Sequence, residues 1–146
     1  MTEKDDFALQ DFLPFLLNRA AEESSLAFQF YYKNRYGMLR NEWRVLFHLG
    51  TYGTMTAKEI GQRAKIHKTK ISRAVAKLTE RRFITRNRDT ADRRSEHLKL
   101  TAAGEAAYRD LRGQAASYDK QLAARFSPEE EQTLRRMLRQ LAGIEE

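Results

Sequence analysis

Residues 68–81 read KTKISRAVAKLTER, and this stretch decides the fold. Ile71, Val75 and Leu78 are spaced i, i+4 and i+7, so they share one face of a helix and predict its buried side. The opposite face carries lysine, threonine, serine and arginine side chains. A helix with one apolar face and one basic face is typical of an element that packs on a core and presents its other side to a polyanion.

A shorter helix is predicted just before this stretch. Thr56-Ala57-Lys58-Glu59 matches the capping box, in which threonine and glutamate side chains satisfy each other's backbone N–H groups. This pattern begins a helix that reaches about Ala64, and Lys65-Ile66-His67 forms the turn that leads into the basic helix. The order predicted here is helix, turn, helix.

Two short strands are predicted after the basic helix, over residues 84–88 and 95–100. In the second strand Leu98 and Leu100 alternate with His97 and Lys99, which is the period of a half-buried strand. The polar segment 89–94 joins the two strands. Residues 56–101 therefore predict a winged helix-turn-helix.

Long helices are predicted on both sides of this lobe. One runs from Phe12 to a loop at 34–37, and a second covers about 41–49 and is broken by the segment 50–54. After the wing, Thr101 begins a helix to about Arg125, and Ser127-Pro128 begins the last one. The predicted class is mostly α with a small β-hairpin wing, as one domain (1–146) with a DNA-binding lobe (38–101) and helical dimerisation regions (7–36 and 102–146).

Positive charge is concentrated in the winged lobe. Residues 62–101 hold thirteen of the 27 basic residues and four acidic ones, a net charge of 13 − 4 = +9, against +7 for the whole chain. Positive charge confined to one stretch of the chain predicts a surface that binds a polyanion, with double-stranded DNA as the leading candidate.

The remaining composition narrows the functional class. At 146 residues with 41% apolar content the chain has the size of one folded domain, and it has no cysteine for disulfides or thiolate metal sites. The acidic N-terminus lacks the positive region of a signal peptide, and no apolar run is long enough to span a bilayer. These features predict a cytoplasmic protein without cofactor, metal site or membrane partner. No catalytic motif is present, so an enzyme is not expected.

The candidate DNA-binding residues follow from groove geometry. The N-terminal part of a recognition helix reaches base edges in the major groove, and a hairpin with arginines near its tip can enter the minor groove. Arg81 continues the line of Arg73 and Lys77 at i+4 steps and is expected to follow the phosphates. The predicted DNA-binding set is Lys68, Thr69, Lys70, Ser72, Arg73, Lys77, Arg86, Arg88, Arg93 and Arg94.

The order and spacing of several motifs resemble the MarR family of bacterial transcriptional regulators. These motifs are Trp43-Arg44-Val45-Leu46, the segment 71–78, the loop Asp89-Thr90-Ala91-Asp92-Arg93-Arg94 and Leu100-Thr101-Ala102-Ala103-Gly104. The resemblance covers essentially the whole chain, and its most specific part is the aspartate-arginine wing followed by Leu-Thr-x-x-Gly. Arg81-Arg82-Phe83 departs from the pattern, because the family commonly has a glycine at the end of the recognition helix.

The resemblance implies a homodimer on a pseudo-palindromic operator, usually a repressor released by a small, often aromatic, ligand. It also implies that Asp89 and Asp92 hold the wing arginines, with Arg93 or Arg94 in the minor groove. Apolar stripes in the terminal helices exceed what one small core needs, which independently favours dimerisation.

Seven of the fifteen aromatic residues fall within residues 28–47, and they cannot all share one helical face. Core and dimer packing is the first interpretation of this cluster, and a ligand pocket is the second. In the pocket, Arg44, His48 or Arg19 would fix a carboxylate or phenol. The predicted lining is Arg19, Phe28, Tyr32, Tyr36, Trp43, Arg44, Phe47, His48 and Tyr108.

Other interpretations remain open from the sequence. The basic run can be a solvated helix face, and the 89–94 loop an ordinary surface ion-pair turn. A constitutive or architectural DNA-binding protein without effector is one rival function. An RNA-binding or protein-interaction module on the same fold is another.

Overall fold

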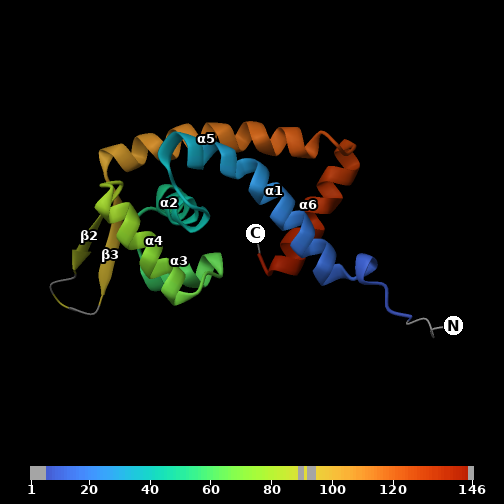
Figure 1. Cartoon of the computed structure of the whole chain (residues 1–146), viewed down its shortest axis with the longest axis horizontal. Helices are drawn as coiled ribbons and strands as arrows, with labels where there is room; N and C mark the ends of the chain where they lie inside the picture. The colour runs from blue at the N-terminus through green and yellow to red at the C-terminus, as the bar shows by residue number, and fades with distance from the viewer. Residues whose placement is uncertain (1–5, 89–90, 92–94, 145–146) are drawn as a thin grey trace. The chain divides into compact units, whose positions relative to one another are not determined.

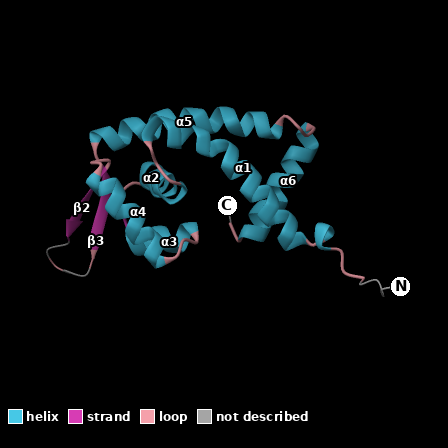
Figure 2. Cartoon of the chain, viewed as in Figure 1, coloured by secondary structure: helices cyan, strands magenta, loops and turns pink. Residues whose placement is uncertain are grey.

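The computed structural model describes residues 6–88, 91 and 95–144, which fall into two compact units, one ending at Leu111 and one beginning at Arg112. Both units are mainly helical, and a small sheet lies in the first, as predicted (Figure 1 and Figure 2). Along the first unit run η1 (Leu9–Asp11), α1 (Leu13–Tyr36), α2 (Arg40–Tyr52), β1 (Met55–Thr56), α3 (Ala57–Ala64), α4 (Lys68–Glu80), β2 (Ile84–Arg88), β3 (Glu96–Leu100) and the start of α5 (Ala102–Ala123). The second unit holds the rest of α5 and α6 (Pro128–Ala142).

The predicted capping boxes set the beginnings of α3 and α6. Glu59 N–H donates to Thr56 Oγ1 at 3.1 Å, and Thr56 N–H donates to Glu59 Oε1 at 2.8 Å. Ser127 and Glu130 make the same reciprocal pair at 3.1 and 2.9 Å. Each pair satisfies backbone N–H groups that have no partner within the helix, so both boundaries follow from local sequence.

The sheet contains one strand more than the predicted hairpin. β3 pairs with β2 on one side and with β1 on the other, and both pairings are antiparallel. β1 joins Met55 to Leu98 and Thr56 to His97. A strand of two residues is too short to show any alternation of apolar and polar residues, so it could not be predicted from the sequence.

The core of the first unit lies beneath α4. Ile71, Val75 and Leu78 are buried as predicted, together with Ala74. α4 packs against α2 and α3, and the largest fully buried side chains around it include Leu46 of α2, Ile60 of α3 and Leu98 of β3. The apolar face of the basic helix is thus fully used in packing.

α2 ends with its C-cap at Gly53, inside the segment 50–54 where a break is predicted, but it passes through Gly50 first. The helix continues to Tyr52, and the ring of Tyr108 lies directly against Gly50. A Cβ atom at residue 50 would be 2.3 Å from Tyr108 Cδ1, so only glycine lets the two helices approach this closely. Likewise α1 continues through the predicted loop to Tyr36 and ends at Gly37, whose φ is +64°.

The exit from α4 uses an arginine where the family commonly has glycine. Arg82 adopts a left-handed conformation with φ +64°, its N–H donates to Thr79 O at 3.0 Å, and Phe83 N–H donates to Leu78 O at 2.9 Å. This is the hydrogen-bond pattern of a Schellman motif. The left-handed conformation costs a non-glycine residue about 1 kcal/mol. The hydroxyl of Thr101 donates to Arg82 O at 2.7 Å and helps to hold the turn.

In the second unit, Arg135 joins α6 to the end of α5. Its guanidinium lies 2.8 Å from Asp119 Oδ2 and 3.0 Å from Glu131 Oε2.

Within the described ranges, no helix combines the length and apolarity that crossing a membrane requires.

Candidate nucleic-acid interface

His67 fixes the N-terminus of α4, a role that the sequence analysis missed. Lys65 ends α3 in a left-handed conformation with φ +57°, and Ile66 is buried beneath the turn. Nδ1 of His67 then accepts the N–H of Thr69 at 3.2 Å. Histidine is not among the usual N-cap residues, so residue type alone gave no signal.

The outward face of α4 carries the predicted recognition residues. Lys68, Thr69 and Lys70 of the first turn are exposed, and so are Ser72, Arg73 and Lys77 further along. All six are exposed, whereas the stripe that begins at Ile71 is buried. The structure therefore brings the predicted base-reading and phosphate-binding side chains of α4 onto one surface.

Glu96 organises the arginines of the wing. It lies directly opposite Arg88 in the β2–β3 register, with Arg86 on the same face of β2. Arg86 Nε is 3.2 Å and Arg88 Nε 3.9 Å from the Glu96 carboxylate, and all three side chains are partly solvent-exposed. Sequence reasoning missed Glu96, although an acid opposite an arginine in a predicted hairpin is a usable signal.

The other predicted wing residues lie outside the described residues. These are Asp89, Asp92, Arg93 and Arg94. The described wing thus contributes Arg86 and Arg88 to the candidate interface, with Glu96 as their neighbour.

Five of the predicted pocket residues form a continuous chain of aromatic rings. Phe28 meets Trp43 with ring centroids 5.1 Å apart, and Tyr32 stacks on Trp43 at 5.5 Å. Trp43 in turn contacts Phe47 at 4.7 Å, and Phe47 contacts Tyr108 at 5.4 Å. The cluster joins α1, α2 and α5 within the first unit, and its rings pack mainly on one another.

The hydroxyl group of Tyr32 is the unusual feature of this cluster. Tyr32 is fully buried, and among the described residues its Oη lies near the Trp43 side chain but has no partner at full hydrogen-bonding geometry. Burial raises the pKa of Tyr32, and the nearby Trp43, Arg40 and Arg44 partly offset that rise. A buried hydroxyl without a hydrogen-bond partner destabilises the folded state by about 1–3 kcal/mol. A polar ligand group that bonded to this hydroxyl would remove that cost.

Arg44 and His48 have structural partners in this conformation. Arg44 Nη2 donates to Ala64 O at the end of α3 at 2.6 Å, and His48 Nδ1 lies 2.7 Å from Arg44 O. Burial lowers the pKa of Arg44, and the neighbouring positive charge of Arg40 lowers it further. Arg44 therefore links α2 to α3 while its guanidinium stays half-buried beside the aromatic cluster.

Tyr36 and Arg19 lie apart from that ring chain. The hydroxyl of Tyr36 donates to Asp110 Oδ2 at 2.6 Å, and its ring meets Phe83.

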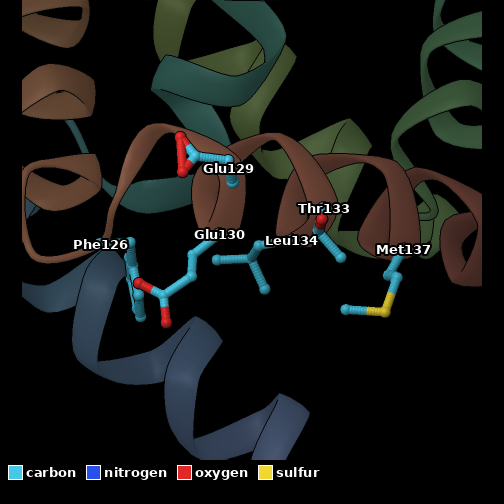
Figure 3. A pocket seen from close by; sticks show the side chains of 6 residues that line it. All are labelled: Phe126, Glu129, Glu130, Thr133, Leu134 and Met137. Atoms are coloured by element: carbon cyan, nitrogen blue, oxygen red, sulfur yellow. The ribbon is translucent and has the colours of Figure 1, made fainter.

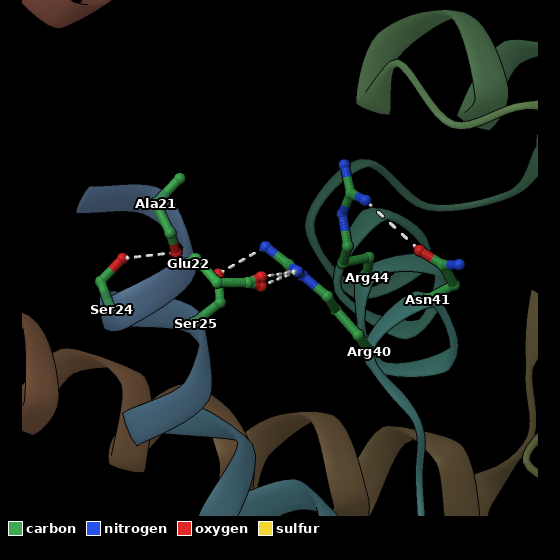
Figure 4. A network of polar contacts seen from close by, with 7 residues as sticks. All are labelled: Ala21, Glu22, Ser24, Ser25, Arg40, Asn41 and Arg44. Atoms are coloured by element: carbon green, nitrogen blue, oxygen red, sulfur yellow. Dashed lines mark hydrogen bonds and ion pairs between the residues drawn. The ribbon is translucent and has the colours of Figure 1, made fainter. Parts of the chain in front are cut away.

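Arg19 lines a surface hollow of about 430 Å³ together with Phe15, Asn18, Ala21, Glu22 and Arg40. Arg40 donates to Ser25 at 2.7 Å and to the Glu22 carboxylate at 3.3 Å beside this hollow (Figure 4).

Large apolar side chains are exposed on the helices predicted to dimerise. In the second unit, a groove of about 400 Å³ on α6 is lined by Phe126, Glu129, Glu130, Thr133, Leu134 and Met137 (Figure 3). Leu138 and Leu141 of the same helix are 41% and 63% exposed. In the first unit, Leu13 and Leu16 of α1 are 63% and 44% exposed. Such apolar faces on a single chain indicate a protein-interaction surface.

Comparison with known proteins matches the winged lobe to a known family. The family model for the MarR family matches residues 36–95, which span α2, the helix-turn-helix and most of the wing. The uncharacterized HTH-type transcriptional regulator YwoH of Bacillus subtilis is 27% identical over 104 residues, covering 71% of this chain and 75% of YwoH.

Solved structures agree with the sequence match. A MarR/EmrR family transcriptional regulator from Acinetobacter sp. ADP1 has a TM-score of 0.84 and 25% identity, with 94% of this chain and 96% of that chain covered. BpsR of Bordetella bronchiseptica, whose DNA binding is regulated by 6-hydroxynicotinic acid, shares the fold with a TM-score of 0.83 at 18% identity over 97% and 100% of the two chains. The winged lobe of this chain therefore matches the MarR family of transcriptional regulators, and the fold is the one seen in a solved MarR/EmrR family regulator.

Proposed function

We propose that this protein is a cytoplasmic homodimer that binds a pseudo-palindromic operator in double-stranded DNA and represses transcription until a small aromatic acid releases it. The observation that carries the proposal is the exposed basic face of α4, backed by a buried apolar stripe and flanked by the Arg86 and Arg88 wing strand. A helix presented in this way fits the major groove of B-DNA.

Two copies are needed because operators of this kind are read in half-sites. Recognition helices in a dimer enter successive major grooves about 34–36 Å apart. The exposed apolar side chains of α1 and α6 supply the surface that a second copy would bury. The dimerisation regions 7–36 and 102–146 and the binding lobe 38–101 are part of this proposal.

The base-reading and phosphate-binding roles on α4 predict different mutant behaviour. Arg73→Ala is expected to cost about 1–3 kcal/mol of binding free energy on the operator and to relax selectivity at one or two base pairs. Lys77→Ala is expected to weaken binding to all sequences alike and to lower the slope of log K against log salt by about one. Both side chains are exposed and have no role in the core, so neither change should alter folding.

The measurement is a selection of bound duplexes from random DNA, followed by titrations of the selected operator, random DNA and a matched RNA duplex. Equal loss on operator and random DNA for Arg73→Ala would show that Arg73 does not read bases. The major groove of A-form RNA is too narrow to admit a helix, so a protein that reads DNA with α4 should prefer the DNA duplex. Preference for the RNA duplex would therefore favour the RNA-binding rival.

The unpartnered hydroxyl of Tyr32 supports an effector site at the aromatic cluster. A phenol or carboxylate group placed there would gain a hydrogen bond to Tyr32, with the positive charges of Arg40 and Arg44 nearby. Related regulation of DNA binding by 6-hydroxynicotinic acid in BpsR makes that compound a suitable first probe. By linkage, a ligand releases DNA only if it binds the DNA-free arrangement better.

One observation favours the constitutive rival. The rings of Phe28, Trp43, Phe47 and Tyr108 pack on one another, and Arg44 donates a hydrogen bond to Ala64 O. These side chains therefore have packing or hydrogen-bond partners without a ligand. A regulator whose cluster is only core would bind its operator equally with and without aromatic acids.

Trp43 distinguishes these two possibilities because it is the only tryptophan of the chain. Titration with 6-hydroxynicotinic acid and other aromatic acids is expected to change its fluorescence and to lower operator affinity in parallel. Tyr32→Phe removes only the hydroxyl, so it should leave the free protein as stable or more stable and weaken ligand binding about 5–10-fold, the value of one hydrogen bond. Unchanged fluorescence and operator affinity across the panel would support the constitutive regulator instead.

A further inference from the structure

Arg81 follows the last residue of α4, and although the residue is exposed, its side chain contacts other parts of the first unit. Its guanidinium lies over the ring of Phe83, with Cζ 5.5 Å from the ring centroid. The same group lies against Gly37, where a Cβ atom would be 3.2 Å from Arg81 Nη1. Arg81 therefore joins the exit of α4 to the end of α1.

A second set of contacts joins the end of α1 to α5 at the same place. Arg35 Nη1 lies 2.7 Å from both carboxylate oxygens of Asp110, and Tyr36 donates its hydroxyl hydrogen bond to that carboxylate. Burial and the bond to Asp110 raise the pKa of Tyr36 to about 12, so the phenol stays a donor at neutral pH. The hydrogen bond from Tyr36 and the Arg35 guanidinium lower the pKa of Asp110, which keeps it an acceptor.

The two sets meet at Phe83. The ring of Tyr36 contacts the ring of Phe83 edge-on at 6.1 Å, while Arg81 covers Phe83 as well. The backbone of Phe83 is held from α5, because Thr101 N–H donates to Phe83 O at 3.0 Å. Within the first unit, the exit of α4 is thus bound to α1 and to α5 through one shared residue.

We propose that Arg81, Tyr36 and Asp110 are positioning residues that set the direction of α4 relative to α1 and α5, and thereby the separation of the two recognition helices on DNA. The inference rests on the proposed dimeric DNA binding. Because the contacts of these side chains are with Phe83, Gly37 and Arg35, they act through the orientation of α4 and not through contact with bases. Arg81 adds the stacking contact on Phe83 on which this arrangement depends.

The experiment compares three DNA duplexes: the operator selected from random DNA, the same operator with one base pair inserted between the half-sites, and an isolated half-site. Asp110→Asn removes the charge that binds Arg35. Arg81→Lys keeps the positive charge and loses the planar group that covers Phe83. Tyr36→Phe keeps the ring and removes only the hydroxyl, so it tests the junction without opening a void.

Asp119→Asn is the matched control for Asp110→Asn. Asp119 is also a carboxylate of α5 bound by an arginine, Arg135, through two contacts of 2.8 and 3.2 Å, but it lies within the second unit. Both variants lose one negative charge from the same helix. Sedimentation and thermal melting of all four variants establish that each is folded and dimeric.

The junction variants are expected to bind the full operator about 5–20-fold more weakly, the size of a typical coupling between sites. They should bind the isolated half-site within a factor of about two of the wild type and prefer the native spacing less strongly, while Asp119→Asn behaves as the wild type. Equal losses on half-site and operator, or wild-type affinity and spacing preference in Asp110→Asn, Arg81→Lys and Tyr36→Phe, would overturn the positioning role alone. A wild type that selects no duplex would overturn the proposed function and this inference together.

Discussion

Gly104→Ala is expected to lower the free energy of unfolding by about 2–3 kcal/mol, the cost of overpacking a well-packed site. Gly104 is buried in the first turn of α5, where its N–H donates to Thr101 Oγ1 at 3.0 Å. A Cβ atom there would lie 2.0 Å from Phe83 O and 3.2 Å from Leu100 Cδ2. The carbonyl belongs to backbone that is already hydrogen-bonded to Thr101, so the new methyl can be accommodated only by moving α5 away from the exit of α4.

Gly113→Ala is the control, because Gly113 lies on the same helix and a Cβ atom there has nothing within 4 Å. Alanine is favoured over glycine in a helix, so this change should raise stability by about 0.5–1 kcal/mol. Chemical denaturation monitored by circular dichroism measures both variants. Two glycine variants of equal stability would show that the close approach at Gly104 is not needed for the fold.

Replacing Leu138 and Leu141 together with aspartate is expected to convert the dimer into monomers. Full burial of one leucine is worth about 1.5–3 kcal/mol, and a symmetric interface loses each side chain twice. Both leucines are exposed in the single chain, so their loss should leave the fold of α6 intact. Operator binding should fall with the dimer, because a monomer can occupy only one half-site.

Sedimentation at micromolar concentration is the measurement. Gln140→Asp, on the same helix and also exposed, adds an acid outside the apolar pair and should remain dimeric. A wild type that sediments as a monomer, or a double aspartate variant that stays dimeric, would exclude this face of α6 from the interface.

The sequence was sufficient where a structure depends on local spacing. The i, i+4, i+7 stripe predicted α4 and its buried side, and the capping boxes at Thr56 and Ser127 predicted two helix starts. The exposed basic face of α4 followed from the same periodicity. Local rules suffice here because a helix repeats every 3.6 residues whatever surrounds it.

The errors arose where distant residues decide the outcome. The predicted helix stops before Gly50, whereas α2 continues to Tyr52, because glycine at residue 50 allows a close approach of the Tyr108 ring, far along the chain. The hydrogen bond from Tyr36 to Asp110 of α5 also joins residues far apart in the sequence, and the spacing of the aromatic residues does not predict it. The conformation of Arg82 shows the reverse case, because hydrogen bonds from outside the helix hold a turn that residue type disfavours.

The order of the three strands has a consequence for how the protein is made on the ribosome. β1 precedes the recognition helix and pairs with β3, the last strand, which also lies between β1 and β2. During translation β1 can therefore pair with β3 only after the whole helix-turn-helix and wing have emerged from the ribosome. Closing so long a segment is slow relative to helix formation. A nascent chain halted before residue 96 is expected to contain α3 and α4 as helices without the sheet that fixes them, so a DNA-binding lobe arises only when β3 has been synthesised.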